Sequence, residues 1–189
     1  RPHDIITSTS TLALTASALA AGYLVFKDAE YLTHAKSLFK AADSTRSNGE
    51  QGIAKSYYPA TDFFDELFYA ANWLYMATGD KSYLEKAEKD YIPEYPLESQ
   101  STEKKFTWGF CWDDHSQAAA LLYALNTKNE EWIEQVQHHL DYWTVGYGGK
   151  KVSYTSDGMA WLFQWGSTRH ATTTAWLAIV AADKLFKNN

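Results

Sequence analysis

The feature that most constrains the fold of this chain is a recurrence of helix-like blocks about every 50 residues. Apolar blocks open near Thr9, Phe63, Asp114 and Thr168. Each block except the last runs through a polar turn into a second helix-like block, as in FKDAEYLTHAKSLF, ATGDKSYLEKAEKDY and LNTKNEEWIEQVQHH. A helix pair that returns at a fixed period predicts a helical toroid.

The two helices of each pair differ in kind. The first helices carry no charge and are apolar on nearly every side, which predicts burial all round; they are 11–26, 67–77, 117–125 and 171–182. The second helices alternate charged and apolar residues at three- and four-residue spacing, which predicts half-exposure; they are 29–42, 81–92 and 130–142. Inner helices wrapped by outer ones are the plan of an α/α barrel. The predicted fold class is therefore all-α.

The length does not suffice for a closed ring. Six helix pairs at this period need roughly 300 residues or more, and the 189 residues hold only about seven helices. The sequence thus predicts an incomplete (α/α)6 barrel, with residues 1–189 forming the central part of a single domain. Both ends are expected to offer apolar inner-helix faces to the remainder of that domain or to a second copy.

Composition excludes some classes of function. The net charge is -6 and no Lys/Arg cluster is present, so we expect no nucleic-acid partner. The single cysteine, Cys111, excludes an internal disulfide and is expected to be a small buried residue. The start, RPHDIITSTS, shows no targeting peptide. The block 12–26 is too short and too rich in Thr and Ser to suggest a membrane span.

Aromatic residues gather in the long connections. These connections, 44–62, 93–113 and 144–167, each join an outer helix to the next inner one, so a toroid places them at one mouth. They contain Tyr57, Tyr58, Phe106, Trp108, Phe110, Trp112, Tyr154, Trp161, Phe163 and Trp165. Aromatic faces interspersed with Asp, Arg and His suit the stacking of pyranose rings and the bonding of their hydroxyls. The alternative is that these side chains only cap the core.

Three segments resemble a known family. DELFYAANWLYMATGDKSYL, FTWGFCWDDHSQAAALL and FQWGSTRHATTTAWLAIVAAD are similar to the Asp-Glu-Leu helix, the Trp-Asp loop and helix, and the Gln-Trp-Gly-Ser-x-Arg stretch of glycoside hydrolase family 9. The members of this family are inverting cellulases with an (α/α)6 barrel. The resemblance covers nearly all of the chain, and it implies an endo-β-1,4-glucanase that acts outside the cell.

The resemblance also implies sugar subsites. These would use Tyr57, Trp108, Trp165, Arg169 and His170. Trp108 and Trp165 would be stacking platforms and Arg169 a hydroxyl donor, while His170 replaces an aromatic residue more usual in the family. A tryptophan common before the Asp-Glu-Leu helix is Ala60 here, so one platform is missing.

Oxygen ligands gather at two helix starts. Hard oxygens from neighbouring units suit calcium, and the resemblance implies a structural Ca²⁺ with the ligands Thr61, Asp62, Asp65, Glu66 and Asp113. In this set, Asp62 stands where a glycine carbonyl is usual. The alternative is that these residues cap helices and complement the helix dipole.

Catalytic residues are not identifiable. Inverting glycosidases need two carboxyls about 6.5 to 9.5 Å apart, and the family takes its base from an upstream Asp-Ala-Gly-Asp segment and its acid from a downstream Glu. Neither motif occurs in the chain, so we expect it to bind glucan without hydrolysing it. Two alternatives remain: a family 76-like glycosidase that uses Asp113 and Asp114 as acid and base, and a non-catalytic glucan-binding fragment.

Overall fold

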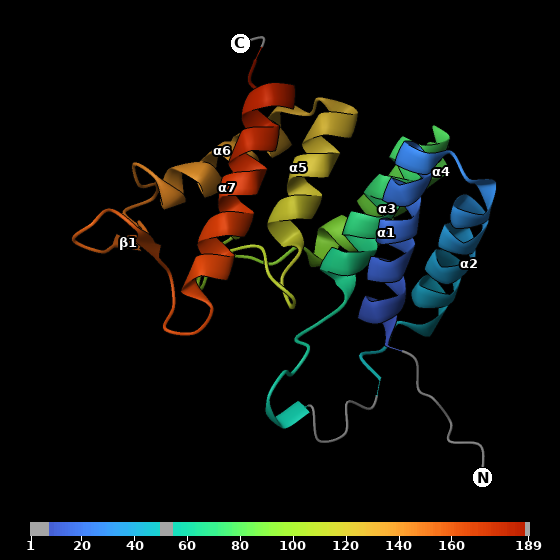
Figure 1. Cartoon of the computed structure of the whole chain (residues 1–189), viewed down its shortest axis with the longest axis horizontal. Helices are drawn as coiled ribbons and strands as arrows, with labels where there is room; N and C mark the ends of the chain where they lie inside the picture. Colours follow the sequence, from blue (N-terminus) through green and yellow to red (C-terminus); the bar gives the residue numbers. More distant parts are fainter. Residues whose placement is uncertain (1–7, 50–54, 188–189) are drawn as a thin grey trace. The chain divides into compact units, whose positions relative to one another are not determined.

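The computed structural model describes residues 8–49 and 55–187, which belong to two compact units divided between Glu94 and Tyr95 (Figure 1). Within these residues the chain forms seven α-helices and one very short β-hairpin. The all-α prediction is thus confirmed. The prediction that all residues form part of one domain stays a prediction.

The first unit is built around α1. Helix α1 (Thr9–Phe26) packs against both α2 (Ala29–Thr45) and α3 (Phe64–Thr78). The ends of these helices follow local rules. The Asp28 carboxylate accepts a hydrogen bond from the Glu30 amide at 2.9 Å and caps α2. Gly79, at φ 71°, ends α3 in the left-handed conformation, as the sequence predicts.

The outer helix predicted over 81–92 is not a uniform α-helix. It begins as α4 (Ser82–Lys86), widens into the π-helical turn η2 (Ala87–Tyr91) and closes with the 3₁₀ turn η3 (Ile92–Glu94). Tyr91, at the end of η2, is buried and donates a hydrogen bond to the Asp43 carboxylate on α2 at 2.8 Å. Lys86 pairs with the same carboxylate at 2.8 Å. Polar contacts therefore fasten the π-helical segment to α2.

Helix α1 is longer than predicted. It begins at Thr9, and among the described helices it alone is long and apolar enough to pass a length and hydropathy test for a membrane span. The sequence argument that this block is too short does not hold. The helix nevertheless buries Ala13, Ala16 and Ala20 completely and packs against two neighbouring helices, as a core helix does.

The second unit is built around α5. Helix α5 (Ser116–Thr127) contacts α6 (Glu130–Trp143) and α7 (Ser167–Lys184). Strands β1 (Ser153–Tyr154) and β2 (Ala160–Trp161) pair antiparallel within the long connection from α6 to α7. This hairpin is local, because its two-residue strands are closed by a turn in which the Thr155 amide donates to the Met159 carbonyl.

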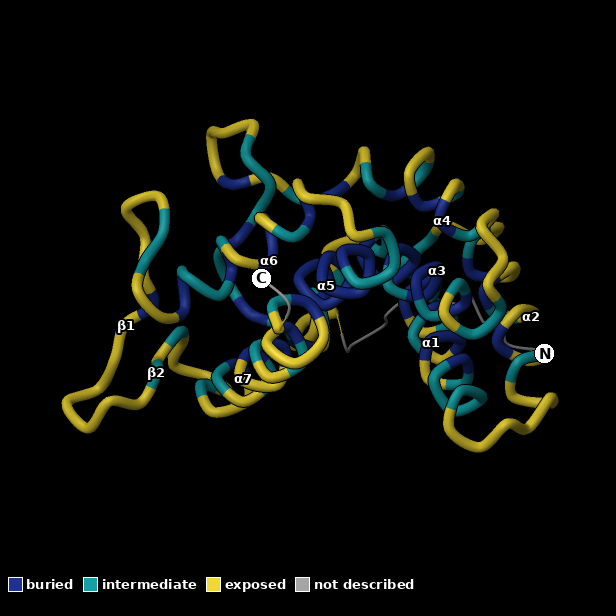
Figure 2. Tube along the Cα trace, turned by 90° about the horizontal axis from the view of Figure 1, so that it is seen from above, coloured by how far each residue is buried: buried dark blue, intermediate teal, exposed yellow. Residues whose placement is uncertain are grey.

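The inner helices differ in burial, contrary to the prediction (Figure 2). Helix α5 buries nine of its twelve residues, whereas α7 buries four of eighteen: His170, Thr174, Leu177 and Ala181. These four are spaced by three or four residues, so they form one stripe. Helix α7 is therefore covered on one face only, and an uncharged composition did not predict burial all round.

Candidate functional site

The site is organised by the connection 95–115, which carries Trp108 and precedes α5. Most of this segment lacks regular secondary structure, so its backbone groups need partners from elsewhere. Side chains supply them. Gln117 of α5 donates to the Lys105 carbonyl, and Thr173 of α7 donates to the Phe110 carbonyl at 2.7 Å. The segment is thus tied to α5 and to α7.

Helix α6 provides a stripe of three donors, Gln135, His139 and Trp143, at four-residue spacing. Gln135 Nε2 donates to the Lys105 carbonyl at 2.8 Å, and Trp143 Nε1 donates to the Trp108 carbonyl at 2.8 Å. Between them, His139 Nδ1 lies 2.7 Å from the Phe106 carbonyl oxygen. A carbonyl only accepts, so Nδ1 carries the proton. One face of α6 therefore fixes three carbonyls of the connection.

His139 makes this contact in a fully enclosed position. Its side chain is 2% exposed. Burial lowers the pKa of His139 to about 4, although the hydrogen bond to Phe106 acts in the opposite direction. The imidazole is therefore neutral at ordinary pH.

A buried carboxylate holds the other side of the same segment. Glu98 Oε1 accepts from the amides of Phe106 and Thr107 at 2.9 and 2.8 Å, and Oε2 pairs with Lys150. Burial acts to raise the pKa of Glu98, but the hydrogen bonds from Lys150 and from the two amides outweigh it, so the pKa lies below its ordinary value. Glu98 is therefore an ionised anchor.

These contacts fix Trp108 in an unusual conformation. Its φ is 78°, which bulky residues rarely adopt and which surrounding structure must enforce. The Trp108 ring lies 5.6 Å from Phe163 and 5.5 Å, edge on, from His170. The next residue, Gly109, has no room for a side chain, since a Cβ there would lie 3.0 Å from the Trp143 ring. The aromatic platform predicted at Trp108 is thus preorganised.

The N-terminal turn of α7 places Arg169 and His170. The Arg169 guanidinium folds over Gly166, where a Cβ would lie 3.0 Å from Nη2. The same Nη2 lies 3.2 Å from His170 Nε2. Trp165, just before Gly166, is 70% exposed and so presents its ring to solvent. Unit two therefore brings Trp108, Arg169 and His170 together, with Trp165 close in sequence.

The predicted subsite residues His170 and Tyr57 differ in burial. His170 is only 1% exposed and contacts Trp108 and Arg169, so its role in a sugar subsite stays a prediction. Tyr57 belongs to the first unit and is 73% exposed. Its role as a sugar subsite stays a prediction.

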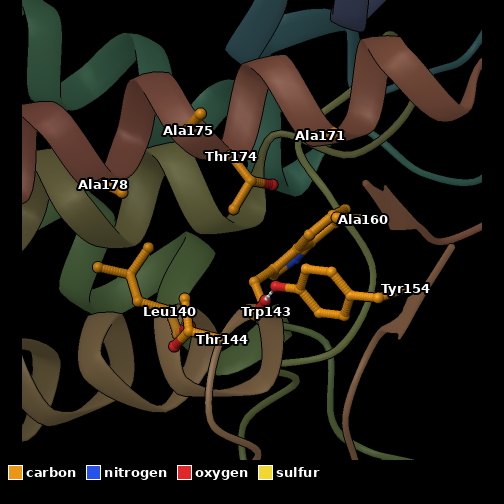
Figure 3. Close-up of a pocket in the computed structure, with 9 residues that line it drawn as sticks. All are labelled: Leu140, Trp143, Thr144, Tyr154, Ala160, Ala171, Thr174, Ala175 and Ala178. Carbon is orange, nitrogen blue, oxygen red and sulfur yellow. Dashed lines mark hydrogen bonds between the residues drawn. The ribbon is translucent and has the colours of Figure 1, made fainter. Parts of the chain in front are cut away.

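A separate apolar pocket of about 200 Å³ lies between α6, α7 and the hairpin (Figure 3). The Tyr154 hydroxyl donates to the Trp143 carbonyl and ties the hairpin to α6 beside this pocket. Its lining consists of Leu140, Trp143, Thr144, Tyr154, Ala160, Ala171, Thr174, Ala175 and Ala178. So apolar a lining offers few hydrogen-bonding groups to a polar ligand.

The predicted calcium ligands fall in both units. Asp65 and Glu66 lie in the first turn of α3 and are 8% and 2% exposed. Asp62 is exposed, and its carboxylate accepts from the Phe64 amide at 2.9 Å, which is a helix-start contact of the kind the alternative predicted. Thr61 is exposed, and Asp113 lies in the second unit. Asp65 and Glu66 are therefore two buried carboxylates in one helical turn, and oxygens of this kind are the ligands that calcium takes.

The geometry does not favour Asp113 and Asp114 as an acid and base pair. Asp114 Oδ1 accepts from the Ser116 amide at 3.1 Å and from its hydroxyl, and Oδ2 pairs with Lys105 at 3.0 Å. Both carboxylate oxygens of Asp114 therefore already have partners, Oδ1 at the start of α5 and Oδ2 on Lys105.

Several supporting residues were missed by sequence reasoning, namely Glu98, Gln117, Gln135, Trp143 and Thr173. His139 was missed as well, and it is buried. Each of these side chains hydrogen-bonds to a backbone group elsewhere in the sequence, and such a contact cannot be inferred from the residue type alone. The only signal was the spacing of two polar residues on the buried side of α6.

The helical fold, the aromatic side chains on the connections and Arg169 in the first turn of α7 together fit the class of α/α-barrel carbohydrate-active proteins. The sequence profile of Glycosyl hydrolase family 9 matches residues 3–189, and the chain belongs to that family. The resemblance seen in the sequence is thereby confirmed, and with it the (α/α)6-barrel fold class.

The individual proteins to which this chain is similar are endoglucanases. Endoglucanase CelQ from Clostridium thermocellum, solved with cellotriose, superposes with a TM-score of 0.89 at 43% identity over 94% of this chain and 30% of that one. Endoglucanase A of Bacillus pumilus is 40% identical over 93% of this chain and 28% of its own length. Endoglucanase B of Cellulomonas fimi is 38% identical over 89% of this chain and 17% of its own length. The chain spans less than a third of each of these relatives.

Proposed function

We propose that the chain is the glucan-binding part of an endo-β-1,4-glucanase. The observation that carries this proposal is the Trp108 platform of a family 9 chain, which the α6 stripe fixes at positive φ and whose ring packs against His170, the residue that Arg169 also contacts. Stacking and guanidinium hydrogen bonds are the two contacts a pyranose ring requires. The titles of the CelQ structures name cellotriose, cellotetraose and cellobiose, which supports β-1,4-linked glucose as the ligand.

Hydrolysis in the complete domain is proposed to proceed by inversion, with acid and base from outside these residues. Near Trp108, the carboxylates of Glu98 and Asp114 are each paired with a lysine. An ionised, paired carboxylate is a poor general acid. The 189-residue chain is therefore expected to bind cello-oligosaccharides without cleaving them.

The test is a titration of cellohexaose into the chain and into Trp165→Ala, with reducing ends assayed in the same samples. A stacked tryptophan buries on the order of 150 to 250 Å², so the variant should bind about ten- to a hundredfold more weakly, or about 1.4 to 2.7 kcal/mol. Trp176→Ala is the matched control, because Trp176 is also exposed, at 49%, but lies well along α7. Equal affinities of wild type and Trp165→Ala would refute the assignment of Trp165 as a stacking platform.

The reducing-end assay also bears on the alternative functions. Binding without release of reducing ends agrees both with the proposal and with a non-catalytic glucan-binding fragment. These two are separated by assaying a longer chain that includes both catalytic carboxylates. Sustained turnover by the 189 residues that is lost on Asp113→Asn or Asp114→Asn would instead support the family 76-like mechanism.

We propose in addition that the chain holds a structural Ca²⁺ through the carboxylates of Asp65 and Glu66 at the start of α3. The support is the burial of two adjacent carboxylates at one helix start, which favours a hard cation over solvent. A cation that binds only the folded state stabilises it, so chelation should lower the melting temperature and added Ca²⁺ should restore it. An unchanged melting temperature would leave these residues as helix caps.

Two further proposals concern where the protein acts and what the exposed face of α7 contacts. Cellulose is an insoluble polymer, and we propose that the protein acts outside the cell. Trp176 and Ile179 on α7 are 49% and 67% exposed, and we propose that this uncovered face contacts further polypeptide, either the remainder of the domain or a second copy. Sedimentation of the chain at rising concentration tests the second possibility, and a strictly monomeric species would count against it.

A further inference from the structure

The contact between Arg169 and His170 depends on the protonation state of the imidazole. A guanidinium has donors and no acceptor, so the 3.2 Å contact from Arg169 Nη2 requires a lone pair on His170 Nε2. The proton of the neutral ring must then lie on Nδ1, a buried atom that would lie 3.2 Å from a Cβ at Gly109. A protonated ring would set an N–H and a positive charge against the guanidinium.

The position of His170 links its contact with Arg169 to the residues expected to bind the sugar. The side chain is 1% exposed and lies in the first turn of α7. Its ring packs against the Trp108 ring in a T-shaped arrangement, and its Nε2 contacts Arg169. A change at His170 therefore reaches both side chains expected to contact the sugar.

We propose that His170 is a positioning residue whose neutral imidazole holds Arg169 for glucan binding, so that affinity falls when His170 takes up a proton. This inference rests on the proposed function. It assigns to His170 a role different from direct sugar contact, and it makes binding by this chain dependent on pH.

The charged groups that face His170 agree with this. Burial and, next, the charge of Arg169 lower the pKa of His170 below its ordinary value, while Asp114 acts in the opposite direction. Asp114 is itself paired with Lys105. Helix α6 contributes the uncharged indole of Trp143, which, like His170, lies next to Gly109. The neutral form therefore prevails at neutral pH, and the loss of affinity is expected on the acid side of pH 6.5.

The first experiment is a calorimetric titration of cellohexaose into the 189-residue chain between pH 5 and 8. Wild-type affinity should fall about tenfold toward the acid end, or about 1.4 kcal/mol. His170→Leu removes the acceptor and should weaken binding about tenfold at every pH. His170→Gln restores an uncharged acceptor, so it should recover most of the affinity lost in His170→Leu and bind independently of pH. A purely structural role would not flatten the pH profile.

His138→Gln is the matched control, because His138 stacks on Tyr147, at a ring distance of 3.8 Å. It should keep the wild-type profile. Circular dichroism of each variant at each pH confirms folding, and should His170→Leu fail to fold, the wild-type and His170→Gln profiles still decide. A flat wild-type profile, or a sloped profile in His170→Gln, would overturn the inference.

The second experiment needs no sugar. Nitrogen-15 NMR of the imidazole should show the Nδ1–H tautomer at pH 7, with Arg169 resonances that shift together with His170 as the pH falls. An Nε2–H tautomer, or a His170 already protonated at pH 7, would overturn the inference whatever the binding result. Absence of cellohexaose binding by wild type at every pH would refute the proposed function and the sugar half of the inference, while the NMR result would still decide the pairing.

Discussion

Acid should destabilise the chain through His139, and the size of the effect follows from its burial. In the unfolded chain this histidine titrates near its ordinary value of 6.5, whereas in the folded state its pKa is about 4. The unfolded state therefore binds the extra proton first as the pH falls, and stability declines between these two values. The full difference of about 2.5 pKa units corresponds to roughly 3 kcal/mol, present above pH 6.5 and lost by about pH 4.

The perturbation that isolates this effect is His139→Asn. An asparagine can keep an N–H donor near the Nδ1 position, facing the Phe106 carbonyl, but it does not titrate. The variant should be less stable than wild type at pH 7, because the smaller side chain leaves a cavity. Its stability should nevertheless decline less between pH 6.5 and 4, by roughly the 3 kcal/mol that His139 contributes.

Urea unfolding followed by tryptophan fluorescence at a series of pH values measures both quantities. Carboxylates such as Glu98 add their own acid dependence, but they do so in both proteins and cancel in the difference. His138→Asn changes the neighbouring histidine on α6 and should keep the wild-type slope. An identical slope in wild type and His139→Asn would show that the imidazole is not held neutral by burial, and the reasoning would fail.

Three further changes test other contacts. Gly166→Ala forces a Cβ to within 3.0 Å of Arg169 Nη2 at a residue with φ 67°, so it should cost roughly 1 to 2 kcal/mol in urea unfolding. Asp43→Ala removes the acceptor for Tyr91 and Lys86 and should cost about 1 to 3 kcal/mol, measured as a lower melting temperature; no change would mean that π-turn η2 is held by packing alone. Glu98→Gln loses the ion pair with Lys150 and should cost about 1 to 3 kcal/mol at pH 7 but less at low pH, because the stabilisation from ionised Glu98 disappears as the pH falls through its lowered pKa.

The helices were predictable because their signals are local. Charge content and three- and four-residue spacing located each α-helix within residues 8–49 and 55–187, and Gly79 marked the end of α3. The π-helical turn over 87–91 was not predictable, since its polar contacts come from Asp43 on another helix. The one-sided burial of α7 was missed for a similar reason, because the amino-acid composition of a helix does not show which other segments pack against it.

The site was predictable only in its outermost layer. Trp108, Trp165 and Arg169 were found from the family resemblance, and two of them lie in contact with His170. The burial of His170 could not be inferred, because a histidine that replaces an aromatic residue can either face the ligand or support a neighbour. Only the packing around Gly109 decides between these possibilities.

The layer beneath the site carried one readable signal. Gln135 and His139 lie four residues apart on the side of α6 that also bears buried Val136 and Trp143. An amphipathic helix normally places apolar residues there, and a buried polar group must be hydrogen-bonded. Two such groups in one stripe therefore indicate that backbone without regular structure lies against the helix. In this chain that backbone is the connection that positions Trp108, so polar residues on a buried face point to the segment whose conformation the function requires.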